Sequence, residues 1–318
     1  MNDFLINKQE SFMKQTIPFA LSALLISGSP VQADSIFYDG FDATAGTQLE
    51  GYNGYSITAE PIFTASNPGS KTAEIQGPGL SVAGQLSAGN AAYMYYQMVG
   101  GAAVPYTATK NLTDFGSVSG IGVNTFYVSA LFNSNDFPTP EDSVLGVWVK
   151  VGIPIDFATG ADRYFSIGIK HAARDYQVFA EGVGTQYGDW KLADYSPGQT
   201  VQVVAKYVIT PMDATGRYRF EVYAAANPVP NLEPSWTFIA GESDAVGSYK
   251  IGTYTVSNLN LTVARSGSDS GSGGLIDEIR IGTNYADVVG VVPEPETWAT
   301  LLAGLGLLGW RMRRHSHA

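Results

Sequence analysis

The chain has 318 residues, of which 45% are apolar, 12% are aromatic and only 15% are charged, and this composition excludes a disordered or fibrous protein. With 18 Lys and Arg against 29 Asp and Glu, the net charge of -11 disfavours nucleic acid as a partner. The lack of Cys excludes disulfides, thiolate metal sites and cysteine nucleophiles.

The N-terminal region has the pattern of a secretory signal peptide. Lys14 precedes an apolar stretch over residues 17–26, and Val31-Gln32-Ala33 supplies a small-residue cleavage site. We therefore predict a signal peptide over residues 1–33. The polar residues before Met13 suit neither a leader nor a fold, so Met13 is an alternative start.

Residues 34–292 have the pattern of one all-β domain. Short runs rich in Val, Ile, Tyr, Phe and Thr are separated by Gly, Pro, Asn and Asp, which predicts about 13 strands. The predicted strands are 36–41, 52–57, 91–98, 126–132, 144–153, 164–169, 176–180, 201–209, 218–224, 236–239, 250–256, 259–264 and 275–281.

Alternation along these strands predicts which face is buried. In the strand over 144–153, Val147, Val149 and Val151 share one face, while Trp148 and Lys150 share the other. Without helices to cover them, sheets with one apolar face must pack on each other. The sequence therefore predicts a two-sheet antiparallel jelly-roll sandwich.

The C-terminal residues combine three unlike elements. They are Pro293-Glu294-Pro295, an apolar run of 13 residues from Trp298 to Trp310, and the basic residues Arg311, Arg313 and Arg314. A helix of that length covers about 20 Å against a hydrocarbon core of roughly 30 Å, so it predicts an unusually short membrane span. The Trp and Arg flanks favour membrane use with a cytoplasmic C-terminus.

This arrangement resembles the PEP-CTERM sorting tail of Gram-negative bacteria over residues 293–318. The resemblance implies an exosortase as partner and leaves open whether the tail is cut. It also implies an exported protein that is held first at the inner membrane and then delivered to the cell surface or extracellular matrix. Bacteria with such tails make extracellular polysaccharide, which is therefore an expected partner.

Parts of the domain are similar to the laminin-G and concanavalin-A-like sandwich family. They are the turn over residues 195–200 before a long strand, the closing strand with Asp277-Glu278-Ile279-Arg280-Ile281-Gly282, and the opening residues 37–42. The resemblance implies neighbouring first and last strands over a domain of residues 34–292. It also implies a structural Ca²⁺ near the termini.

Candidate catalytic groups are few. A retaining glycosidase needs two carboxylates about 5 to 5.5 Å apart. Glu242 and Asp244 have no second Glu nearby, and Asp277 and Glu278 are adjacent, so strand alternation predicts that they point to opposite faces. His171 is the one histidine of the predicted domain, and we expect it at the surface end of a strand. No catalytic residue is therefore predicted.

Two binding sites stay open. Calcium takes oxygen ligands, and Asp39, Asp42 and Asp277 can converge if the first and last strands are neighbours, although Asp39 also suits an ordinary turn. Trp190, beside a turn, is the candidate for stacking on a sugar, with core packing as the competing explanation.

These observations favour an exported, non-catalytic surface or matrix protein. Whether the jelly roll binds glycan is left open by the sequence. The alternative is a hydrolase or lyase that acts on extracellular polysaccharide.

Overall fold

The computed structural model describes residues 35–59, 73–82, 89–96, 106–112, 125–134, 147–157, 163–172, 175–183, 188–211, 218–228, 232–241, 254–255, 258–265, 272–289 and 305. These residues all belong to one compact unit, which spans residues 34–318. The predicted signal peptide and, apart from Leu305, the predicted sorting tail lie outside the described residues.

Sheet A contains eight of the described strands. They are β1 (Ser35–Asp39), β3 (Ala73–Gln76), β4 (Ala91–Tyr96), β6 (Thr125–Asn133), β11 (Val201–Pro211), β12 (Tyr218–Ala226), β13 (Thr237–Gly241) and β16 (Ser272–Gly282). The order across the sheet is β13-β12-β11-β6-β16-β4-β3, and β1 also pairs with β16. The first and last strands are therefore neighbours, as predicted.

Sheet B contains the other eight described strands. They are β2 (Tyr55–Ala59), β5 (Tyr106–Asn111), β7 (Val147–Phe157), β8 (Arg163–Ala172), β9 (Asp175–Val183), β10 (Gly188–Asp194), β14 (Tyr254–Thr255) and β15 (Asn258–Arg265). The order is β10-β9-β8-β7-β15-β5-β2, and β14 pairs with β7. Neighbouring strands in both sheets are antiparallel.

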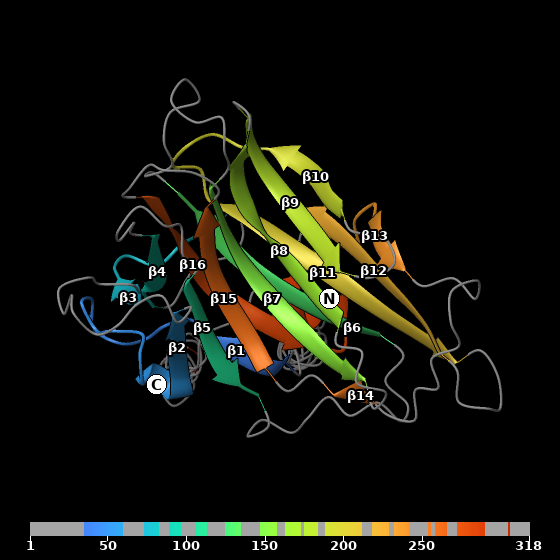
Figure 1. Ribbon diagram of the computed structural model, residues 1–318, viewed down its shortest axis with the longest axis horizontal. Coiled ribbons are helices and arrows are strands. Elements are labelled where there is room, and N and C mark those ends of the chain that lie inside the picture. Colours follow the sequence, from blue (N-terminus) through green and yellow to red (C-terminus); the bar gives the residue numbers. More distant parts are fainter. Residues whose placement is uncertain are drawn as a thin grey trace, which may run out of the picture. The chain divides into compact units, whose positions relative to one another are not determined.

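The two sheets are layered face to face, with β15, β7, β8 and β9 in front of β16, β6 and β11 in Figure 1. Their inward side chains form one hydrophobic core, to which β7 contributes Val147, Val149 and Val151. Trp148 and Lys150 are half-buried on the other face. The predicted two-sheet antiparallel jelly-roll sandwich is confirmed.

Three strands were missed by the sequence pattern, namely β3, β5 and β10. Each is short, and β5 (Tyr-Thr-Ala-Thr-Lys-Asn) contains a single core aliphatic residue, Ala108. β3 and β10 are edge strands that pair with the adjacent strands β4 and β9, and β5 pairs with the distant strand β15. Pairing of this kind stabilises segments whose local composition is a weak strand signal. The predicted strand over 52–57 is also shorter than expected, because it opens with the 3-10 turn η1 (Tyr52–Gly54).

A short helix, α2 (Tyr285–Val289), follows β16 and packs against sheet A. The Ser129 hydroxyl on β6 donates a hydrogen bond of 2.7 Å to the Val288 carbonyl. A Cβ at Gly282 would lie 2.5 Å from the Cβ of Asp287, so the close approach of α2 requires glycine there. Within the described residues, no helix combines the length and the apolar character needed to span a membrane.

Candidate functional site

A β-bulge in β16 gathers a cluster of buried charged side chains on the outer face of sheet A. The register between β16 and β6 shifts between Asp277 and Arg280. Glu278 has a φ of 50°, in the left-handed region that residues other than glycine rarely adopt. A bulge of this kind bends the strand and redirects the side chains beside it.

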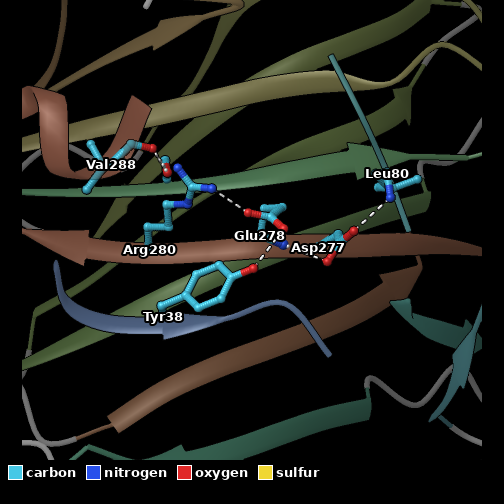
Figure 2. Close-up of polar contacts among 7 residues, drawn as sticks. Tyr38, Leu80, Asp277, Glu278, Arg280 and Val288 are labelled. Atoms are coloured by element: carbon cyan, nitrogen blue, oxygen red, sulfur yellow. Dashed lines mark hydrogen bonds and ion pairs between the residues drawn. The ribbon is translucent and has the colours of Figure 1, made fainter. Parts of the chain in front are cut away.

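Glu278 is the centre of the cluster, and Figure 2 shows the two groups that reach it. The Tyr38 hydroxyl on β1 donates to Glu278 Oε1 at 2.9 Å. The Arg280 guanidinium donates to Glu278 Oε2 at 2.6 Å, and both side chains of this ion pair are almost fully buried. Arg280 also lies over the Tyr38 ring, 5.5 Å from its centroid. Burial and the Glu278 carboxylate raise the pKa of Tyr38, so Tyr38 remains a proton donor at neutral pH.

Asp277 is held by backbone groups. Its Oδ2 accepts a 2.7 Å hydrogen bond from the Leu80 amide, and its Oδ1 accepts a 2.8 Å bond from the Glu278 amide. Asp277 is completely buried. The cluster therefore joins β1, β16 and the chain around Leu80.

The predicted separation of Asp277 and Glu278 onto opposite faces is wrong. Ile276 and Ile279 both point into the core, so the two acidic residues between them lie on the outer side together. The physical reason is the bulge, which inserts one residue and interrupts alternation. A signal was present in the sequence, because core residues at 276, 279 and 281 break the period of two.

The contacts limit what this cluster can do chemically. Both carboxylates are at most 1% exposed, and each accepts hydrogen bonds from within the chain. Tyr38, with 41% exposure, is the member that reaches solvent. A glycosidic bond has no direct access to either carboxylate in this arrangement, which instead fastens strands together.

A second charged pair, Asp39 and Lys110, connects the two sheets. Asp39 on β1 and Lys110 on β5 are both almost fully buried, with 3.8 Å between Asp39 Oδ2 and Lys110 Nζ. The Phe41 amide and the Asn53 side chain also donate to Asp39. Burial raises the pKa of Asp39, while these donors and Lys110 oppose the rise.

The three predicted calcium ligands lie in different surroundings. Asp39 pairs with Lys110 between the sheets, Asp277 bonds to backbone amides on the outer face of sheet A, and Asp42 is exposed. Among the described residues, no group of three or more Asp, Glu or His side chains is placed to hold a metal ion. Calcium binding stays a prediction, which melting temperatures with Ca²⁺ and with a chelator would check.

The outer face of sheet B has its own polar network. Lys150 on β7 forms a 2.5 Å ion pair with Glu181 on β9, and the Ser166 hydroxyl on β8 donates to the same Glu181 oxygen at 3.0 Å. Nearby, the Lys170 ammonium lies 5.2 Å from the centroid of the Phe179 ring. The contacts of Lys150 and Ser166 balance the negative charge of Glu181 and join β7, β8 and β9.

Trp190 lies on β10, paired with Ala180 of β9. It is half-buried and packs against the main hydrophobic core. Its role in sugar binding stays a prediction, and the packing favours the structural alternative.

His171 is buried, which corrects the expectation of a surface position. It lies at the end of β8 with no exposed area, and its ring stacks on Tyr176 with 4.7 Å between centroids. Neither ring nitrogen has a hydrogen-bond partner among the residues that the structure describes. Its position continues the inward series of Phe165, Ile167 and Ile169, so alternation alone could have placed it in the core.

This burial predicts loss of stability at acidic pH. Burial lowers the pKa of His171 below its ordinary 6.5, with Asp175 opposing the shift, so the unfolded chain binds this proton first as pH falls. The free energy of unfolding should therefore decrease as pH falls below 6.5. We expect urea unfolding at pH 7.5 and pH 5 to show a larger decrease for the unaltered protein than for His171→Leu. Equal decreases would contradict a buried, neutral His171.

The predicted sorting residues lie outside the described residues, and sequence comparison bears on them. Residues 291–314 match the PEP-CTERM protein-sorting motif. The match includes Pro293-Glu294-Pro295 and the basic residues Arg311, Arg313 and Arg314. The motif implies export with a membrane-anchored intermediate and an exosortase as the partner that recognises it.

Comparisons of the whole chain give weaker likenesses. The chain is similar to the endo-1,3-beta-glucanase of Streptomyces sioyaensis, with 10% identity and a TM-score of 0.48 over 80% of this chain and 97% of that one. It is also similar to a pseudo beta-1,3-glucanase of Mycobacterium tuberculosis, with 12% identity and a TM-score of 0.44 over 79% of this chain and 99% of that one. An alginate lyase of Pseudomonas aeruginosa has 11% identity to the chain and a TM-score of 0.33, over 59% of this chain and 85% of that one. No curated protein matches the chain.

Proposed function

We propose that this chain is an exported, non-catalytic protein of the cell surface or extracellular matrix in a Gram-negative bacterium. Its laminin-G or concanavalin-A-like sandwich is delivered through the C-terminal tail and binds extracellular polysaccharide. The observation that carries the proposal is the match of residues 291–314 to the PEP-CTERM protein-sorting motif. An exosortase is the partner that acts on the tail.

The charged groups of the sandwich support a role without catalysis. Asp277 and Glu278 are buried and hydrogen-bonded, Asp39 faces Lys110, and Glu181 faces Lys150. General acid and base catalysis requires a proton donor or acceptor, commonly a carboxyl or imidazole group, within hydrogen-bond reach of the substrate. These described carboxylates are instead bound to partners of the same chain, and His171 is buried.

The alternative is a hydrolase or lyase, and one observation favours it, namely that the bulge places Asp277 and Glu278 on one side of β16. Incubation of the full chain with the host's extracellular polysaccharide separates the two functions. We expect no new reducing ends and no unsaturated sugars. Products that form with the unaltered chain but not with Glu278→Gln would replace our proposal with the enzymatic one.

The basic end of the tail predicts a change in sorting. Arginines on one side of a membrane span hold that side in the cytoplasm. Replacement of Arg311, Arg313 and Arg314 by Ser should therefore reduce the inner-membrane intermediate and the amount of correctly sorted protein. Cell fractionation measures both. The matched control replaces the same residues by Lys, which keeps the positive charge, and this variant should sort normally. If the Ser variant fractionates as the unaltered protein does, the basic end of the tail has no role in sorting.

A further inference from the structure

Five aromatic side chains and Lys206 form a line across the outer face of sheet A, from β13 to β6. Four of its members are direct cross-strand partners, and two more lie beside them. They are Phe238 on β13, Tyr223 on β12, Lys206 on β11 and Tyr127 on β6, together with Trp236 and with Tyr285 on α2. We name these six residues the aromatic row.

The ring contacts of the aromatic row form two groups, Phe238 with Tyr223 and Trp236 with Tyr127 and Tyr285. The Phe238 and Tyr223 centroids are 5.5 Å apart, and Trp236 lies 6.1 Å from both Tyr127 and Tyr285. Such edge-to-face and tilted pairs are favourable ring arrangements. The register of β13, β12, β11 and β6 places Lys206 between the two groups of rings, so the row spans four strands.

Exposure increases toward the edge of the sheet. Phe238 is 47% exposed, and its cross-strand partner Tyr223 is half-buried. Trp236 and Tyr285 are half-buried, while Tyr127 at the inner end is buried. Clustered apolar exposure of this kind marks binding surfaces more often than chance exposure of single residues does.

The charge of Lys206, the one charged member of the row, is balanced by the neighbouring Glu233. The Lys206 ammonium lies 5.4 Å from the centroid of Trp236 and forms a 2.7 Å ion pair with Glu233. The Trp236 indole also donates to Glu233 at 2.9 Å. These hydrogen bonds lower the pKa of Glu233, so the pair is ionised and balanced at neutral pH. The row thus offers ring faces and polar groups without net charge.

We propose that the aromatic row is the surface on which this protein binds a neutral polysaccharide chain. Sugar rings present apolar C–H faces to aromatic planes, and their hydroxyls can bond to polar groups at the ring edges, here Lys206, Glu233 and Tyr285. The net charge of -11 disfavours a polyanionic polysaccharide and a second copy of the same acidic chain. The inference rests on the proposed function, because only an exported protein meets extracellular polysaccharide.

Sedimentation with insoluble polysaccharide tests this site. The full chain in detergent is mixed with cellulose, with curdlan or, as the polyanionic contrast, with calcium alginate beads. We expect binding to at least one of the two neutral glucans and none to alginate. Phe238→Ala and Trp236→Ala should each weaken that binding roughly fivefold, through the loss of one stacking plane.

Tyr95→Ala is the matched control, since it removes a half-buried aromatic ring from β4 of the same sheet, outside the aromatic row, and it should bind as the unaltered chain does. Melting temperatures verify that each variant folds, and Phe238→Ala keeps the test valid if Trp236→Ala does not fold. Absence of binding to both glucans, or equal binding by the unaltered chain and Phe238→Ala, would overturn the site while export still stands. Self-association that Phe238→Ala abolishes would overturn it in favour of a protein interface.

Discussion

Lys110→Met should destabilise the sandwich by about 3 to 5 kcal/mol at neutral pH, because it leaves the Asp39 carboxylate buried without its counter-charge. The substitution also removes the hydrogen bond of 2.6 Å from Lys110 to the Asn53 carbonyl. The ammonium further lies 5.2 Å from the centroid of the Tyr55 ring. Urea unfolding of the variant and the unaltered protein measures the difference.

The control is the double variant Asp39→Asn with Lys110→Met, which removes both charges and should recover much of the lost stability.

The stability loss caused by Lys110→Met should also depend on pH, with a defined sign. Burial raises the pKa of Asp39, and removal of Lys110 raises it further, so the carboxyl takes up a proton more readily in the folded variant. The loss caused by Lys110→Met should therefore shrink as pH falls. A loss within about 0.5 kcal/mol, as for ordinary surface substitutions, would contradict the buried pair.

Glu278→Leu should be comparably severe, with a loss of about 3 to 5 kcal/mol, because Arg280 would stay buried without this carboxylate. Urea unfolding again provides the measurement.

Tyr38→Phe measures the contribution of the Tyr38 hydroxyl separately from that of the Glu278–Arg280 ion pair. It removes only the hydrogen bond to Glu278 and should reduce stability by about 1 kcal/mol. A double-mutant cycle between Glu278→Gln and Arg280→Met should show strong coupling. Purely additive effects would mean that the two side chains do not interact in solution.

The fold was predictable because its central strands are long and strongly patterned. In β7, alternation of Val147, Val149 and Val151 with polar neighbours gives both the strand and its buried face. Where the sequence reasoning failed, a tertiary contact overrides the local pattern. In β5, Lys110 lies at a core position, where a charged residue is not expected from the sequence. It is buried there because Asp39 on β1 lies opposite it.

The candidate sites were harder to predict, for different physical reasons. The bulge at Glu278 left a detectable trace in the spacing of core isoleucines, and the burial of His171 followed from alternation in β8. The aromatic row left none, because Tyr127 and Phe238 are far apart in the chain and meet only through the pairing of β6, β11, β12 and β13. Strand register across a sheet is set by the whole fold.

Deletion of the exosortase tests most directly whether the C-terminal tail delivers this sandwich to the cell exterior. The unaltered chain is expressed in a bacterium that recognises PEP-CTERM tails and in the same strain without its exosortase. Surface proteolysis and membrane fractionation then locate the domain. We predict that it reaches the surface or matrix in the first strain and accumulates in the inner membrane of the second. The same distribution in both strains would contradict delivery through the tail.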